Sequence, residues 1–295
     1  MKRVLVAGAT GYLGRYVVKE FKKQGYWVRA LTRSADRLDD LKNYVDEAFI
    51  GAVTDPASLD GICQDIDIVF SSIGITKQKD NLTYMDVDYQ GNKNLLDEAK
   101  KAGVAKFIYI FVFNAEKMNN LKGIQAKLKF TQALKRSGLD YLIVNPNGFF
   151  SDMLEYLKMA QQGRGYVFGS GEYRINPIHG QDLAEACVNA VDESGKEIDV
   201  GGPEVFTHNQ ILAIAFESLE KPVKISRIPI WLRNVILAML RLFTSVKTYG
   251  PQEFFMTVLA MDMVAPPYGK YHLKDFFLEN CRGLEDVAHA KLQGI

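Results

Sequence analysis

A chain of 295 residues is long enough for one large domain, or for one medium-sized domain with a smaller companion. Hydrophobic residues make up 47% of the chain and charged residues 24%, an ordinary globular composition that excludes a disordered or fibrous protein. The 36 Lys and Arg against 35 Asp and Glu leave a formal net charge of +1, so no long-range field gathers nucleic acid or anionic lipid. Any anion binding must therefore be local.

The cysteines and histidines bear on the compartment and on metal binding. Cys63, Cys187 and Cys281 are odd in number and widely spaced, which predicts reduced thiols in the cytoplasm. The first apolar run ends at Gly8, which is far too short for a signal peptide or a membrane span. No metal site is predicted, because the four histidines form no cluster with ligand spacing: His179, His208, His272 and His289.

Short β-branched apolar runs alternate with helical stretches through the first half of the chain. The expected strands cover 2–8, 26–32, 46–51, 67–73, 106–112 and 140–145. The expected helices between them cover about 12–24, 34–43, 56–62, 82–102 and 123–137. This alternation predicts an α/β fold, a Rossmann-type doubly wound parallel sheet with crossover helices.

The pattern changes after Pro146 to short mixed elements that are richer in Gly and Pro. We therefore predict a Rossmann-type domain over 1–148 and a smaller α+β lobe over 149–295. No Ser/Gly-rich linker separates the two parts, so the lobe is expected to pack directly on the first domain.

Residues 228–243 form a strongly apolar stretch that carries Arg233 and Arg241. The stretch is too short and too charged to span a bilayer. A helix packed against the core is the favoured interpretation, and a helix that lies on a membrane surface or in a dimer contact is the alternative.

The glycine-rich turn Gly8-Ala9-Thr10-Gly11-Tyr12-Leu13-Gly14 follows the first strand and begins the first helix. In such a turn the first glycine allows a tight bend, the second lets the backbone approach a pyrophosphate, and the third lets helix and strand pack closely. The free N–H groups at the helix N-terminus then bind the anion. The strand–turn–helix context makes this motif a predicted dinucleotide site. The domain over 1–148 is therefore predicted to bind NAD(P), and the lobe over 149–295 is predicted to bind substrate.

The end of the second strand indicates which dinucleotide is bound. An acid usually stands about 20 residues beyond the turn to bind the ribose 2′-hydroxyl, but this chain has Arg33 and Ser34 there, with Arg33 22 residues beyond Gly11. A guanidinium forms charge-assisted, often bidentate bonds with a 2′-phosphate. NADP(H) is therefore predicted in preference to NAD(H).

Several later motifs accompany the glycine turn: Asp88-x-x-Gly91-x-x-Asn94-Leu95, Ser137-Gly138-Leu139-Asp140-Tyr141, Asn145-Pro146-x-Gly148-Phe149 and Asn176-Pro177-Ile178-His179-Gly180-x-Asp182-Leu183-Ala184. Together these motifs resemble the atypical short-chain dehydrogenases/reductases of the NmrA-like and isoflavone-reductase-like group. The resemblance extends from residue 1 to about 220. It implies an interleaved architecture, in which elements at about 180–192 return to the first domain.

The resemblance also implies a Tyr-x-x-x-Lys pair, in which the lysine binds the nicotinamide ribose and the tyrosine protonates a carbonyl oxygen. Lys127 is the candidate lysine, but Gly123 occupies the tyrosine position, and Phe111 stands where the usual serine would be. Lys127 is therefore expected to bind the ribose or to act as a lone acid/base, with a plain surface lysine as the alternative. Aromatic residues, including Phe149 and Phe113, could line a site for an apolar ligand or could be ordinary core.

The complete predicted site has Lys127 as the single catalytic candidate and holds no metal. The predicted cofactor-binding residues are Gly8, Thr10, Gly11, Tyr12, Leu13, Gly14, Arg33, Ser34, Ser72, Gly74, Lys127, Pro146 and Gly148.

Three functions fit this reading of the sequence. The leading hypothesis is an NADP(H)-dependent reductase of a small apolar carbonyl or conjugated alkene. The alternative is a non-catalytic NADP(H)-binding redox sensor or assembly protein, and a nucleotide-sugar epimerase or dehydratase is third because its chemistry also needs the missing tyrosine. The expected partners are a small molecule or none, with no nucleic acid, and the expected state is a monomer or homodimer.

Overall fold

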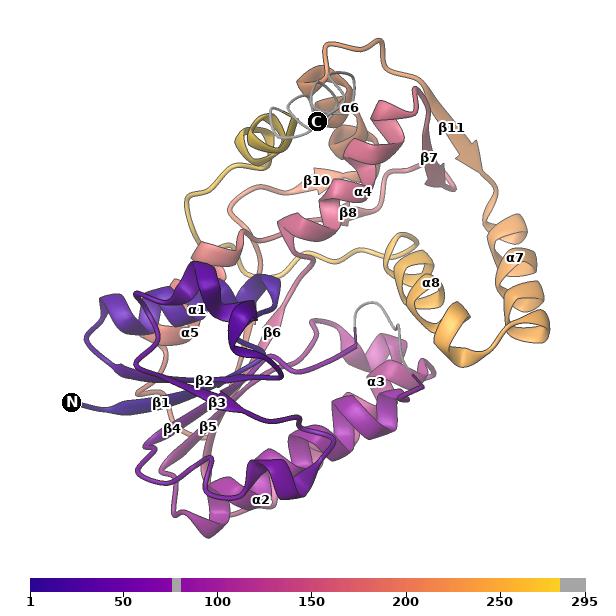
Figure 1. Cartoon of the computed structure of the whole chain (residues 1–295). Coiled ribbons are helices and arrows are strands. Elements are labelled where there is room, and N and C mark those ends of the chain that lie inside the picture. The colour runs from indigo at the N-terminus through magenta and orange to yellow at the C-terminus, as the bar shows by residue number, and fades with distance from the viewer. Residues whose placement is uncertain (76–80, 282–295) are drawn as a thin grey trace, which may run out of the picture.

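The computed structural model describes residues 1–75 and 81–281 of the chain. A seven-stranded parallel sheet forms its centre, in the order β3-β2-β1-β4-β5-β6-β9 (Figure 1). The six strands expected from the sequence are confirmed, and they are β1 (Arg3–Ala7), β2 (Trp27–Thr32), β3 (Glu47–Ile50), β4 (Ile68–Ser71), β5 (Lys106–Ile110) and β6 (Asp140–Pro146). This is the expected doubly wound α/β fold.

Alternate residues of β1 show how the sheet is covered on both faces. Val4 and Val6 pack with one set of buried side chains, which belongs to α1 (Tyr12–Lys23) and α5 (Gly180–Asn189). Leu5 and Ala7 pack with a second set, to which α2 (Asn92–Lys101) and α3 (Lys122–Lys135) contribute. All four β1 side chains are fully buried, as expected for a central strand between two helical layers.

Two of the expected helices are short 3₁₀ turns, η1 (Ala35–Leu41) and η2 (Pro56–Leu59), and a third such turn is η4 (Ala115–Met118). The expected helix at 82–102 is divided into a π-helical turn, η3 (Met85–Gly91), and α2. Asn92 at this junction donates from Nδ2 to the Asp88 carbonyl at 2.9 Å, and its Oδ1 accepts from the Ser71 hydroxyl at 2.5 Å. The π-turn thereby places Asp88 at the edge of the sheet, and such turns are frequent at functional sites.

The C-terminal half contributes both to the sheet and to a separate lobe. Helix α5 packs on α1, and β9 (Lys196–Val200) pairs in parallel with β6 as the outermost strand. The remaining elements form the lobe, which has two two-stranded sheets and several helices (Figure 1). These elements are α4 (Phe150–Gln161), β7 (Gly165–Phe168), β8 (Arg174–Ile175), β10 (Phe206–Thr207), α6 (His208–Ser218), β11 (Ile225–Ile228), α7 (Ile230–Phe243), α8 (Val246–Val258) and a helical segment at 273–281.

Helix α7 confirms the expected helix at 228–243 but not its packing. Leu237 is its one buried residue, so the expectation of a core-packed helix is wrong. The helix is held instead against α8, to which Arg233 and Arg241 both reach. Among the residues that the structure describes, no helix is long and apolar enough to cross a membrane.

Buried polar residues connect the lobe to the sheet. Asn176 is fully buried and donates from Nδ2 to the carbonyls of Gly202 and Ala265, at 3.0 and 2.8 Å. Asp182, also fully buried, accepts from the backbone N–H groups of Lys270 and Tyr271 at 3.1 and 3.0 Å. These bonds fix the segment around 265–271 against the sheet domain.

Candidate cofactor and active site

The C-terminal ends of the parallel strands meet at one edge of the sheet, and the predicted site residues gather there. The strand order reverses between β1 and β4, which is where doubly wound sheets bind their ligands. The glycine turn follows β1, Ser72 and Gly74 follow β4, and Pro146 ends β6.

The three glycines of the turn have different surroundings. Gly8 has φ +92°, and a Cβ there would lie 2.5 Å from Ser72 Oγ; a Cβ on Gly14 would lie 2.0 Å from the Gly8 carbonyl oxygen. A Cβ on Gly11 would meet only that same oxygen, at 3.2 Å. Gly8 and Gly14 are therefore required by the fold, whereas the bare backbone of Gly11 leaves open space over the helix end.

Helix α1 begins at Tyr12 with Gly11 as its N-cap, and no side chain caps its free N–H groups. The Tyr12 hydroxyl accepts from the Gly180 N–H at 3.0 Å, and Leu13 is buried. The Thr10 carbonyl accepts from Arg15 Nε at 3.3 Å. The side chains of Tyr12 and Leu13 thus serve the fold, and the backbone of the turn is the part available to a pyrophosphate.

Arg33 is an exposed side chain just beyond the C-terminal end of β2. Because Ala7 pairs with Leu31 in the sheet, Arg33 lies at the same edge as the glycine turn. Arg15 is occupied by an ion pair with Asp40, but Arg33 has no carboxylate partner in the described part of the chain. The Ser34 N–H donates to Thr32 Oγ1 at 3.3 Å, which shapes the loop that carries Arg33.

Lys127 and Asp88 form a buried ion pair beside Gly74. Lys127 Nζ lies 2.9 Å from Asp88 Oδ1, and the Asp88 side chain is fully buried. A Cβ on Gly74 would lie 2.6 Å from that nitrogen and 2.8 Å from that oxygen, so any larger residue there would displace the ion pair. Asp88 Oδ2 also accepts from the Ile75 N–H at 3.1 Å, which fixes the carboxylate.

The ion pair determines the charge of Lys127. Burial alone would lower the pKa of Lys127, but the charge of the Asp88 carboxylate, followed by the effect of Tyr109, raises that pKa overall. The ammonium therefore stays protonated at neutral pH. A donor with so high a pKa is a poor general acid, whereas a fixed ammonium suits the hydroxyls of a ribose.

Tyr109 adds a hydroxyl group to the site, and the sequence analysis did not identify this residue. It precedes Phe111 by two residues on β5, and the two rings stack with centroids 6.4 Å apart. Lys127 Nζ lies 5.8 Å from the centroid of the Tyr109 ring. Burial raises the pKa of Tyr109 to about 12, and within the described residues its hydroxyl has no hydrogen-bond partner of good geometry. The signal was the position of Tyr109 on the same face of the strand as Phe111.

Tyr84 fills the space beside Gly123. A Cβ on Gly123 would lie 3.2 Å from Tyr84 Cε1, and a Cβ on Gly250 of α8 would lie 2.8 Å from the Tyr84 hydroxyl oxygen. Burial, followed by the charge of Asp88, raises the pKa of Tyr84 to about 12. A tyrosine at position 123 could not be added without moving this ring.

The segment after β6 is anchored by its backbone. The Pro146 carbonyl accepts from the Phe113 N–H at 3.1 Å, and the Gly148 carbonyl accepts from the Ile178 N–H at 2.8 Å. The Phe149 ring lies 6.0 Å from the Tyr12 ring, centroid to centroid. Pro146 and Gly148 therefore lie at the expected edge, and their contact with a cofactor stays a prediction.

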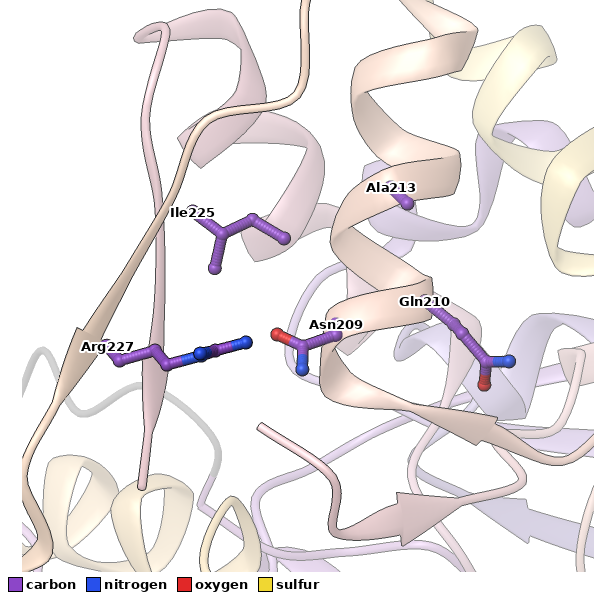
Figure 2. Close-up of a pocket in the computed structure, with 5 residues that line it drawn as sticks. All are labelled: Asn209, Gln210, Ala213, Ile225 and Arg227. Carbon is purple, nitrogen blue, oxygen red and sulfur yellow. The ribbon is translucent and has the colours of Figure 1, made fainter. Parts of the chain in front are cut away.

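A separate open hollow of about 630 Å³ lies in the C-terminal lobe, between α6 and β11 (Figure 2). Its lining residues are Asn209, Gln210, Ala213, Ile225 and Arg227. Figure 2 shows the Arg227 and Asn209 side chains directed toward one another across it. None of these residues belongs to the sheet edge, so the hollow is distinct from the predicted cofactor site. In the described residues no group of His, Cys, Asp or Glu could hold a metal ion.

Comparison with known proteins agrees with this geometry. A family model described as NAD(P)H-binding matches residues 8–194. Among curated relatives, the photosystem II assembly factor Ycf39 of Synechocystis sp. is 26% identical over 280 residues, with 92% of this chain and 86% of the relative covered. The chloroplastic divinyl chlorophyllide a 8-vinyl-reductase of Arabidopsis thaliana is 29% identical over 323 residues, covering 95% and 76%.

Solved structures share the fold at low sequence identity. A nucleoside-diphosphate-sugar epimerase of Staphylococcus aureus has a TM-score of 0.70 at 17% identity, covering 94% of this chain and all of that one. The NADPH-dependent quinone oxidoreductase of Escherichia coli, complexed with NADPH, has a TM-score of 0.68 at 17% identity, covering 95% and 99%. At this identity both structures show the fold alone.

Proposed function

Because the chain belongs to the NAD(P)H-binding family, we propose that it is an NADP(H)-dependent reductase of a small, largely apolar compound with a conjugated alkene or an activated carbonyl. The observation that carries the proposal is the buried Lys127–Asp88 ion pair, at the sheet edge that also holds the glycine turn. The pair gives a fixed cation where a nicotinamide ribose is held in proteins of this architecture.

The turn and its surroundings fit a dinucleotide phosphate. Gly11 leaves open space over an uncapped helix N-terminus, and the Tyr109 hydroxyl beside Lys127 has an unused hydrogen bond in the described structure. Arg33 supports NADP(H) over NAD(H), because an exposed, unpaired guanidinium suits a 2′-phosphate. When bound, NADPH would supply the hydride.

Few side chains at the site can donate a proton, which favours a substrate whose reduction needs little proton transfer from the protein. Gly123 has no phenol, and Lys127 is held protonated by Asp88. Hydride addition to one carbon of a conjugated alkene leaves a delocalised carbanion, which water can protonate at the neighbouring carbon. Phe111, Phe113 and Phe149 near this edge suit an apolar substrate. The Arabidopsis relative is named for the reduction of a vinyl group, which supports the alkene.

A non-catalytic NADP(H)-binding sensor or assembly protein is the second candidate. The glycine at position 123, whose neighbouring space is filled by Tyr84, favours it, and the relative from Synechocystis is named as an assembly factor. An epimerase or dehydratase is less favoured, because that chemistry also needs the phenol. The three cysteines are free and buried, which supports a reducing compartment such as the cytoplasm.

The test is the consumption of NADPH, followed by its absorbance, with aldehydes, ketones, quinones and enones. We expect turnover with enones or vinyl-substituted aromatic rings, and rates with simple ketones that are lower by about 10²–10⁴-fold, since a general acid is lacking. Lys127→Met is expected to weaken NADPH binding and turnover. Lys122→Met, an exposed residue of the same helix, is the matched control and should leave both unchanged.

Two results would decide against the reductase. Fast reduction of simple ketones that survives Lys127→Met would mean that another acid carries the chemistry. Tight NADPH binding with no turnover of any compound would favour the sensor or assembly protein instead.

A further inference from the structure

Helix α7 presents an apolar stripe to solvent. Residues 231, 234, 235, 238, 239 and 242 share one face at helical spacing, all are exposed, and Asn234 is the one polar member. Trp231 is 66% exposed at one end, and Leu242 and Phe243 are 75% and 71% exposed at the other. At 1.5 Å per residue the stripe is about 16 Å long. An apolar face of this kind usually marks an interaction site.

The chain around the stripe is strongly cationic. Between Lys221 and Gln252 the sequence contains six Lys or Arg and no Asp or Glu, although the whole chain has a net charge of only +1. Arg233 and Arg241 hold α7 to α8, through the Met256 carbonyl and the Glu253 carboxylate. The four remaining cations lie before and after α7 in the chain, and they are Lys221, Lys224, Arg227 and Lys247. Lys221 donates to the Gln161 carbonyl, and Arg227 is directed into the hollow of Figure 2. The exposed Lys224 and the partly exposed Lys247, which makes one bond to the Asn81 side chain, are therefore the cations nearest to α7 in the chain that can face a charged surface.

We propose that α7 docks this protein on an anionic lipid bilayer, with the stripe from Trp231 to Leu242 immersed at the interface and the flanking Lys224 and Lys247 near the lipid phosphates. An apolar helical face with basic flanks is the arrangement by which helices lie in a membrane surface. Trp231 at one end of the stripe suits the depth of the headgroups, where tryptophan is enriched. A hollow of about 310 Å³ beside Met239 and Phe243, lined by α7 and Thr244, adds apolar surface for an acyl chain.

The charges favour lipid over a second copy of the chain. In a symmetric dimer formed through the stripe, the same surface of both copies would meet, and two segments without a single carboxylate would lie together. Like charges in one interface oppose association. A bilayer that contains phosphatidylglycerol offers the complementary charge.

Vesicle flotation with the full chain tests the proposal, without NADPH, so that its failure is separate from that of the proposed function. We expect binding to phosphatidylcholine vesicles that contain phosphatidylglycerol, weaker binding at high salt, and little binding to pure phosphatidylcholine. The pair Trp231→Ser and Leu242→Ser should lower the affinity by ~10-fold or more. Replacing Lys224 and Lys247 with Gln should lower it by about five-fold per cation. Ile50→Ser, which changes an apolar residue of β3 that is 54% exposed, is the control that should bind as the wild type.

Tryptophan fluorescence locates the contact. The chain has two tryptophans, and Trp27 lies in β2, far from α7 in the fold. In a Trp27→Phe variant the emission of Trp231 should shift to the blue on addition of anionic vesicles. Absence of that shift, vesicle binding that survives the stripe substitutions, or a stable dimer by light scattering that Leu242→Ser dissociates would each overturn the proposal.

Discussion

Arg33 is the residue on which the proposed choice of NADPH depends. It is exposed, unpaired in the described structure and at the same sheet edge as the glycine turn. A charge-assisted bond to a 2′-phosphate contributes ~1.5–3 kcal/mol, about ten-fold or more in affinity. We expect Arg33→Ala to weaken NADPH binding by about that factor and to leave NADH binding nearly unchanged, as measured by titration calorimetry.

Arg37→Ala is the matched control for that measurement, because Arg37 is an exposed cation of the neighbouring turn η1 whose bonds to Ser34 and Arg15 are made by its backbone. Wild-type protein that binds NADPH and NADH equally well would contradict the proposed role of Arg33.

Among the individual site residues, those that belong to a local sequence motif could be predicted from the sequence. The glycine turn and Lys127 were found because each has a fixed position relative to a strand or a helix. Asp88 was quoted only as part of a motif, and Tyr109 was not considered, because their contact with Lys127 joins η3, β5 and α3 across the sheet edge. Such a contact depends on tertiary packing, which periodicity does not report.

The backbone geometry of the glycine turn at the start of α1 predicts how substitutions of its glycines affect folding and binding. Gly11 has extended backbone angles, φ −80° and ψ 172°, that valine also adopts, and its Cβ would meet only the Gly8 carbonyl. We therefore expect Gly11→Val to fold with a native circular dichroism spectrum but to lose dinucleotide binding, since the side chain would fill the pyrophosphate space. Gly14→Ala should instead lose the fold, because its Cβ would lie 2.0 Å from that carbonyl oxygen.

Both variants are measured by urea unfolding and by NADPH titration. If Gly11→Val bound NADPH with wild-type affinity, the pyrophosphate would have to lie elsewhere.

Elements with strong periodicity were predicted well, and those defined by distant contacts were not. The six strands from β1 to β6 follow from short apolar runs. Strand β9 was missed because its sequence, Lys-Glu-Ile-Asp-Val, is polar at an edge that faces solvent. The packing of α7 was predicted incorrectly, because an apolar helix reads alike in sequence whether its face meets a core or solvent.

The whole molecule is interleaved, and this leads to a prediction about its fragments. The boundary expected at 148 would separate β6 from β9 and α1 from α5, although Leu183 and Cys187 of α5 are fully buried against the sheet domain. We expect a fragment of residues 1–148 to lack cooperative urea unfolding, followed by Trp27 fluorescence, because loss of α5 and β9 uncovers part of the core. Cooperative unfolding of that fragment with NADPH affinity equal to that of the full chain would show that the first domain is independent.

The number of connections between sheet and lobe also limits how the two can move. The chain passes between them after β6, before α5 and after β9, and residues 263–267 bridge back to Ile175 and Gly201. A body attached at one point can swing in every direction, but each further attachment removes a degree of freedom. The lobe is therefore expected to stay in one position over the sheet edge and not to swing open about a hinge. We therefore expect a dinucleotide to enter and leave sideways, past Gly11 and Arg33, with small displacements of the loops in place of a wide opening of the lobes.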